Sequence, residues 1–186
     1  TYWQTIDDAS GYDTISYSGF QSCTIDLREG RFSIVGDAIT FSDGTSSLTT
    51  VSIGPGTVIE AAIGGTGSDR LIGNGANNVL KGGGGGDRLY GGAGGDQLFG
   101  GLDDDVLTGS SGIDYFVFNT GLTSATPNVD RITDFSVKDD TIRLDDAVFT
   151  KLKRGVLPAS KFTIGKQAKD SSDRIIYDKR TGDLFY

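Results

Sequence analysis

The chain has 186 residues and a formal net charge of −8 at pH 7, which together with the lack of a basic run excludes nucleic acid and anionic membrane surfaces as expected partners. No stretch of about 18 apolar residues is present, so no membrane-spanning helix is predicted. The sequence contains 0 His, which excludes imidazole-based catalytic triads and most zinc sites, and we expect no catalytic residues.

The acidic residues are 23 Asp but only 2 Glu, Glu29 and Glu60. Because Glu favours helices and Asp does not, this bias indicates loops in which a short carboxylate occupies a fixed place. The single cysteine, Cys23, cannot form an internal disulfide, and we expect a buried thiol rather than a reactive one. Met is absent even at position 1, which predicts a piece of a longer chain, and no signal-peptide pattern is visible.

Residues 1–54 are predicted to be an N-terminal β region that packs on the repeats that follow. Turn signals separate short β-rich runs, which predict strands at 14–18, 23–27, 31–35, 38–41 and 48–53. Four aromatic residues lie near the start, Tyr2, Trp3, Tyr12 and Tyr17. They could form a carbohydrate-binding platform, but packing beneath the repeats is the favoured interpretation.

A nine-residue repeat dominates residues 55–117. Six nonapeptides follow one another without a slip from residue 64, namely GGTGSDRLI, GNGANNVLK, GGGGGDRLY, GGAGGDQLF, GGLDDDVLT and GSSGIDYFV. Position six holds Asp69, Asn78, Asp87, Asp96, Asp105 and Asp114, and position eight holds Leu71, Leu80, Leu89, Leu98, Leu107 and Phe116. Upstream, residues 55–63 fit weakly, and residues 8–16 fit again with Gly11, Asp13 and Ile15.

This pattern is that of calcium-binding β-helix repeats. Six residues form a tight glycine loop, and three form a short strand whose middle side chain points inward. Two nonapeptides then make one turn of a flattened coil, so that every second repeat stacks on the same edge. A phosphate-binding loop, a collagen helix and a disordered linker fit this spacing less well.

Calcium explains the aspartates, because it takes six to eight oxygen ligands, including backbone carbonyls. Stacking predicts four sites, at the pairs Asp69–Asp87, Asp87–Asp105, Asn78–Asp96 and Asp96–Asp114, with a doubtful fifth between Glu60 and Asn78. The Asn78 site should be the weaker one, since an amide carries no charge. Further ligands are expected in the loops, at Gly65, Gly67, Gly83, Gly85, Gly92, Gly94, Gly101, Asp103 and Gly112, and upstream at Asp13.

Residues 118–186 are predicted to cap the end of the repeats, because solenoids need atypical terminal units. Two strands are expected within 128–149, with Ile132, Phe135, Ile142 and Leu144 turned inward. Asp145 is the expected N-cap of a short helix through about Leu152. Residues 174–186 predict a hairpin with its turn near Thr181 and Gly182. The group Asp139, Asp140, Asp145 and Asp146 is by default a solvated turn, with Asp134 and Asp140 as the best candidates for calcium ligands.

Three segments of the chain resemble a known family. TIDDASGYDTISYSGF (5–20), SIGPGTVIEAAIGGTGSDRLIGNGANNVLKGG (52–83) and DRITDFSVKDDTIRL (130–144) are similar to the C-terminal domain of serralysin-type M10 secreted metalloproteases, which belong to the RTX (repeats-in-toxin) proteins. The resemblance implies an all-β fold, a right-handed parallel β-roll with flanking strands and a C-terminal hairpin cap, in one cooperative domain. It also implies several bound Ca²⁺ ions, four or more.

The resemblance further implies export by a type I secretion machinery and an extracellular location, in a Gram-negative bacterium. The metalloprotease signature H-E-x-x-H cannot exist in a chain with 0 His, so this piece is expected to be non-catalytic. It is also expected to be monomeric and to serve a parent catalytic domain. The alternatives are a stand-alone calcium-dependent adhesin or matrix protein, and the repeat module of a secreted lipase or alginate epimerase. The sequence leaves the parent's activity open.

Overall fold

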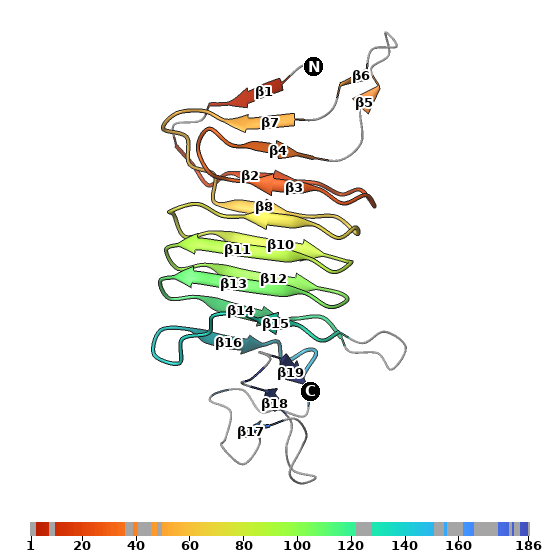
Figure 1. Ribbon diagram of the computed structural model, residues 1–186, viewed down its shortest axis with the longest axis vertical. Helices are drawn as coiled ribbons and strands as arrows, with labels where there is room; N and C mark the ends of the chain where they lie inside the picture. Colours follow the sequence, from red (N-terminus) through yellow and green to blue (C-terminus); the bar gives the residue numbers. More distant parts are fainter. Residues whose placement is uncertain are drawn as a thin grey trace.

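A computed structural model describes residues 3–7, 10–35, 39–40, 46–47, 50–121, 128–150, 155, 162–165, 175–178, 180 and 183–185. Throughout these ranges the regular structure is β-strand, and the strands stack along one long axis as successive coils (Figure 1). Among the same residues, none forms a helix with the length and apolar character needed to cross a membrane. The expected all-β parallel β-roll is confirmed.

The strands form two main sheets. The first contains, in spatial order, β1 (Trp3–Ile6), β7 (Thr50–Ile53), β4 (Phe32–Ile34), β3 (Thr24–Asp26), β9 (Arg70–Ile72), β11 (Arg88–Ala93), β13 (Val106–Ser111), β15 (Arg131–Ile132), β19 (Asp183–Phe185), β18 (Ile175–Asp178) and β17 (Phe162–Ile164). The second contains β16 (Thr141–Leu144), β14 (Tyr115–Phe118), β12 (Gln97–Gly101), β10 (Val79–Gly83), β8 (Ala61–Ile63) and β2 (Thr14–Ser16). A small separate ladder joins β5 (Ile39–Thr40) to β6 (Ser46–Ser47).

The strand register follows the repeat. In the first sheet Leu71 lies opposite Leu89, and Leu89 opposite Leu107. In the second sheet Leu80 lies opposite Leu98, and Leu98 opposite Phe116. Each strand of the roll therefore pairs in parallel with the strand two nonapeptides away, as the sequence predicts.

The position-eight side chains form the core between the two sheets. The five leucines of this series and Phe116 are at most 1% exposed. Ile15 and Ile25 extend the series upstream and Ile132 extends it downstream, all within one continuous apolar cluster. At about 25 cal/mol per Å² of apolar surface removed from water, this column is the main favourable contribution to the stability of the coils.

The flanking regions contain strands that the sequence did and did not predict. A strand lies within each of the five predicted N-terminal ranges, whereas β1 and β6 were missed. The chain reverses direction at β4, which pairs antiparallel with both β3 and β7. At the other end β18 and β19 form the expected antiparallel hairpin, although its turn near Thr181 and Gly182 lies outside the described residues.

The predicted helix after Asp145 is wrong where the structure describes it. Residues 146–148 form a turn, in which the Asp145 carboxylate accepts a hydrogen bond from the Ala147 amide at 2.9 Å. The Asp145 carbonyl accepts from the Val148 and Phe149 amides. Phe149 is 4% exposed, and Leu152 lies outside the described residues.

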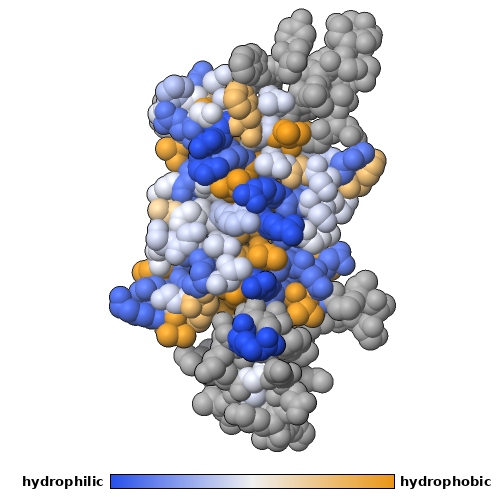
Figure 2. Space-filling model, viewed as in Figure 1, coloured by the Kyte–Doolittle hydropathy of each residue, from blue (hydrophilic) through white to orange (hydrophobic). Residues whose placement is uncertain are grey.

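Outward-facing side chains pair across the coils. The Arg143 guanidinium lies 3.5 Å from the centre of the Tyr115 ring, and the Arg70 guanidinium lies 4.5 Å from that of Tyr90. On the face shown in Figure 2, hydrophobic side chains are scattered among strongly hydrophilic ones. Near the start, Tyr17 packs against the core as predicted, whereas Tyr12 is 63% exposed and does not; Tyr2 and the Trp3 side chain lie outside the described residues.

Loop positions two and four adopt positive φ in the four repeats from residue 82 to residue 117. Glycine occupies six of these eight positions, and Asp103 (φ 72°) and Ser110 (φ 77°) occupy the other two. A Cβ atom in this region of φ costs roughly 1–2 kcal/mol. Ser110 and Asp103 therefore store local strain.

We expect Ser110→Gly to raise the free energy of unfolding by about 1 kcal/mol, since it removes the strained Cβ and keeps the Ser110 amide that donates to Asp134. Ser111→Gly is the matched control. Ser111 lies in β13 without a positive φ, so glycine at this position should lower the free energy of unfolding. Thermal unfolding in one buffer measures both. A lower midpoint for Ser110→Gly than for the native chain would contradict the prediction.

Candidate metal centre

The position-six side chains form two hydrogen-bonded ladders. In the first ladder the Asp69 amide donates to Asp87 Oδ1 at 2.7 Å, and the Asp87 amide donates to Asp105 Oδ1 at 2.8 Å. In the second ladder the Asn78 amide donates to Asp96 Oδ1 at 2.7 Å, and the Asp96 amide donates to Asp114 Oδ1 at 2.9 Å. The structure thus brings together the four pairs expected from the spacing.

Both ladders continue beyond the repeats. The first begins at Cys23, whose amide donates to Asp69 Oδ1 at 2.6 Å, and ends at Asp130, which accepts from the Asp105 amide at 3.1 Å. The second ends at Asp140, which accepts from the Asp114 amide at 3.0 Å. Upstream of it the Asp13 amide donates to Glu60 Oε2 at 2.9 Å, and Asn78 Nδ2 donates to the Glu60 carbonyl at 3.2 Å. Sequence reasoning found Asp13 and Asp140 but missed Asp130 and Cys23.

A signal for the missed members was present in the sequence. The triplets DRI (130–132) and CTI (23–25) place an inward apolar residue two positions after the ladder residue, as every repeat does. Without the glycines around them, these triplets were not distinctive. Cys23 is 3% exposed and its thiol is free, as expected, and burial together with nearby Asp69 raises the pKa of that thiol.

The second carboxylate oxygen of four ladder residues has no hydrogen-bond donor. Oδ2 of Asp87, Asp96, Asp105 and Asp114 is buried and unpartnered. These four atoms are here called the orphan oxygens. The surroundings of two orphan oxygens are defined by the neighbouring glycines. Asp87 Oδ2 and the Gly100 carbonyl both lie against Gly82. Asp96 Oδ2 and the Gly109 carbonyl both lie against Gly91. A Cβ at either glycine would collide with these oxygens, so glycine is required there.

Burial changes the protonation of these carboxyl groups. Removal from water raises the pKa of Asp87 to about 7, with smaller contributions from Asp69, Asp103 and Asp130. It raises the pKa of Asp96 to about 7 as well, assisted by Asp114. Burial likewise raises the pKa of Asp105, Asp114 and Asp130. The charged form of these groups is therefore disfavoured in the metal-free roll.

The donor set fits a hard cation. Among the residues that the structure describes, no group of three or more His, Cys, Asp or Glu could hold a metal through side chains alone. Asp87 Oδ2 and Asp96 Oδ2 instead lie beside backbone carbonyls of the next coil, and carboxylate plus carbonyl oxygen is the ligand set of Ca²⁺ rather than of zinc or copper. Residues such as Asp87 with Gly100, and Asp96 with Gly109, are suited to hold such an ion.

The predicted glycine carbonyls have other contacts. Those of Gly65 and Gly83, at position two, accept hydrogen bonds from the Gly84 and Leu102 amides. The Gly101 carbonyl accepts from Thr120 and Asn128 side chains. The remaining predicted glycines lie against the neighbouring coil at the outer part of the loops, namely Gly67, Gly85, Gly92, Gly94 and Gly112. The carbonyls that lie beside Asp87 Oδ2 and Asp96 Oδ2 are those of Gly100 and Gly109, at position one, which the sequence interpretation did not select.

Two other predicted aspartates lie outside the ladders. Asp134 accepts hydrogen bonds from the Gly109 amide at 3.0 Å and the Ser110 amide at 2.8 Å, one on each oxygen. Asp103 Oδ2 accepts from the Gly85 amide at 3.1 Å. Both side chains therefore fasten loops. Asp139 is paired with Lys138 at 3.5 Å on the surface, in agreement with a solvated turn.

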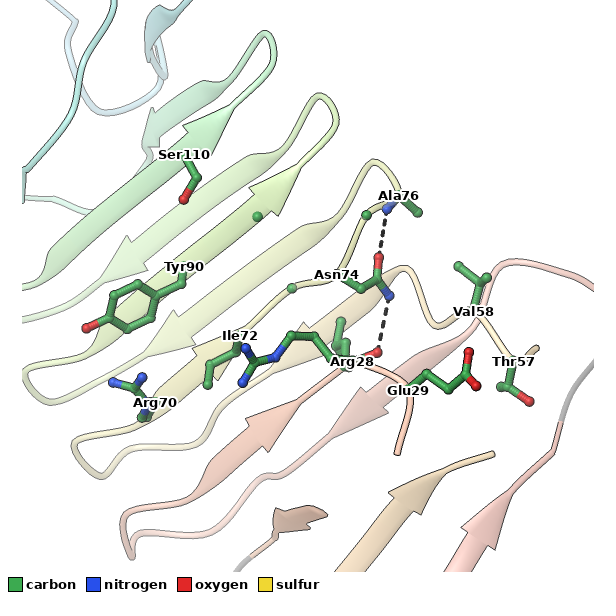
Figure 3. Close-up of a pocket in the computed structure, with 14 residues that line it drawn as sticks. Arg28, Glu29, Thr57, Val58, Arg70, Ile72, Asn74, Ala76, Tyr90 and Ser110 are labelled. Carbon is green, nitrogen blue, oxygen red and sulfur yellow. Dashed lines mark hydrogen bonds between the residues drawn. The ribbon is translucent and has the colours of Figure 1, made fainter. Parts of the chain in front are cut away.

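A groove of about 700 Å³ lies on the outer side of the first sheet (Figure 3). Arg28, Arg70, Tyr90 and Asn74 are among its lining residues. Arg28 is held by two hydrogen bonds to Asp26, and Arg70 lies over Tyr90. None of the orphan oxygens belongs to a residue that lines this groove, so it is separate from the candidate metal centre.

The raised pKa values predict the pH dependence of the metal-free fold. A carboxyl whose pKa is about 7 when folded and near its ordinary value of about 4 when unfolded takes up a proton on folding between those limits. Stability should be fully present below about pH 4 and decline as the pH rises through about 7. Protein freed of divalent ions should therefore show more β-structure by far-UV circular dichroism at about pH 5 than at about pH 8. More β-structure at about pH 8 would contradict the prediction.

Comparison with known proteins agrees with this geometry. The family described as Peptidase M10 serralysin C terminal matches residues 3–174, a range that contains both ladders and the core column. No curated protein matches the chain. The match covers more than half of the sequence, and the fold is the parallel β-roll expected of that family. The chain therefore belongs to the serralysin C-terminal family of M10 peptidases.

Proposed function

We propose that this chain is a calcium-dependent folding module of a larger secreted protein. The observation that carries the proposal is the set of four orphan oxygens at Asp87, Asp96, Asp105 and Asp114. A buried carboxylate oxygen that lacks a donor costs several kcal/mol unless a ligand satisfies it. Their regular recurrence along both edges argues for a shared ligand rather than four separate defects.

Bound Ca²⁺ would supply positive charge between the orphan oxygens and the carbonyls that face them. Asp87 and Asp105 on one edge, and Asp96 and Asp114 on the other, are the proposed carboxylate ligands. Ligand that binds only the folded state stabilises it by mass action. The roll is therefore proposed to fold when calcium is abundant and to unfold when calcium is scarce.

This behaviour suits a protein that crosses membranes unfolded. In the M10 serralysins the C-terminal region is non-catalytic and the protease activity lies in the N-terminal domain. We assign the same role to this chain, with a catalytic domain as its covalent partner, a type I secretion machinery as its route and the extracellular space as its destination. A single free thiol, Cys23, means that no internal disulfide has to form on the way.

The test is a calcium titration that starts in chelator and is followed by far-UV circular dichroism. We expect a cooperative gain of β-structure. Asp96→Asn should move the half-point to about tenfold higher calcium, a loss of about 1.4 kcal/mol, because the amide supplies no charge to an ion at this loop. Glu29→Gln removes the same charge from an exposed position outside both ladders and should leave the half-point unchanged.

Two results would refute the proposal. One is a chain that is fully β-structured in chelator and shows no response to calcium. The other is an Asp96→Asn variant that titrates in the same way as Glu29→Gln, since the orphan oxygen would then have no part in calcium binding.

A further inference from the structure

The loops of the first two repeats, residues 64–81, differ from the four that follow. At positions two and four the later loops have φ values between 72° and 136°. The corresponding residues Gly65, Gly67, Asn74 and Ala76 have no positive φ. The sequence reflects this difference in the second repeat, where two residues with a Cβ atom stand at positions that would be strained in the later conformation.

The different loop conformation supplies the donor that the orphan oxygens lack. The Gly65 amide donates to Asp69 Oδ2 at 2.7 Å, and the Asn74 amide donates to Asn78 Oδ1 at 2.8 Å. The other Asp69 oxygen accepts from the Cys23 amide. Both oxygens of Asp69 are therefore satisfied by the protein, and the orphan series begins only at Asp87.

Asn78 is satisfied without a cation on its other side as well. Its Nδ2 donates to the carbonyls of Ile59 and Glu60, each at 3.2 Å, and the residue is 1% exposed. A carboxylate at position 78 would place a negative oxygen against these two carbonyls. The amide is thus matched to its surroundings in the absence of calcium, whereas Asp96, the next member of the same ladder, is not.

Asn74 joins this repeat to two segments that precede it. Its Nδ2 donates to the Ile59 carbonyl at 2.8 Å and to the Leu27 carbonyl at 3.3 Å. Its Oδ1 accepts from the Ala76 amide at 2.8 Å (Figure 3). Leu27 follows β3, and Ile59 precedes β8. One partly buried amide network therefore holds residues from three parts of the chain together.

We infer that residues 64–81, clamped by Asn74 and Asn78 to the segments before them, form a calcium-independent template at the N-terminal end of the roll. The inference rests on the proposed function, because it divides the roll into a part that needs calcium and a part that does not. Asn78 is the residue that sets the limit: it replaces a calcium-dependent contact with an amide clamp. The coils from residue 82 onward then add to an end that is already formed.

Hydrogen–deuterium exchange in chelator and in calcium tests this inference. In chelator, amides of the native chain within 64–81 should exchange about tenfold or more slowly than those within 82–117, and calcium should protect both. In the Asn78→Asp variant, amides within 64–81 should lose their protection against exchange in chelator and regain it in calcium. Asn77→Asp is the matched control, because Asn77 is exposed and uses only its Oδ1, which accepts from the Gly95 amide at 2.7 Å and which a carboxylate retains.

The outcomes separate the inference from the proposed function. Equal, fast exchange of both segments of the native chain in chelator, with protection of both in calcium, would overturn the template and leave the calcium-dependent module standing. Protection of 82–117 in chelator would overturn the proposed function itself. An Asn78→Asp variant that keeps 64–81 protected in chelator, as Asn77→Asp should, would overturn the role of the amide clamp.

Discussion

The structure depends on how the buried oxygens of the position-six side chains are satisfied. Each ladder carboxylate uses Oδ1 to accept an amide from the preceding coil, and this contact fixes the distance between coils. Its Oδ2 then lies in the loop, where glycine leaves space and exposes a carbonyl of the next coil. The same geometry that stacks the coils thus buries four carboxylate oxygens without a donor, and we propose that a cation meets them.

The apolar column inside the roll cannot by itself explain the fold. Leu89 and Leu98 are fully buried in the coils that carry Asp87 and Asp96, so hydrophobic burial and carboxylate burial occur together. Folding of each coil removes both kinds of group from water, with opposite effects on the free energy. A metal that binds only the folded loops would change the balance between them, and the proposed response of the roll to calcium follows from this.

Much of this arrangement could be predicted from the sequence, because its period is strict. A spacing of nine placed Leu71 to Phe116 inside and paired Asp69 with Asp87 across one turn. The ends of the roll were harder: Asp130 and Cys23 occupy ladder positions without the glycines that mark a repeat. The conformational difference between the loops was hidden as well, because φ at Gly65 and Gly83 depends on the neighbouring coil and not on residue type.

The most direct test of the central claim is the dependence of the unfolding free energy on calcium concentration. Denaturant unfolding gives the free energy of unfolding at each calcium concentration. The slope of this free energy against RT ln[Ca²⁺] is the number of ions taken up when the chain folds. If each of the four orphan oxygens is met by a cation, the slope should be about four. A slope of zero would contradict the account, because the buried carboxylates would then be stable without a metal.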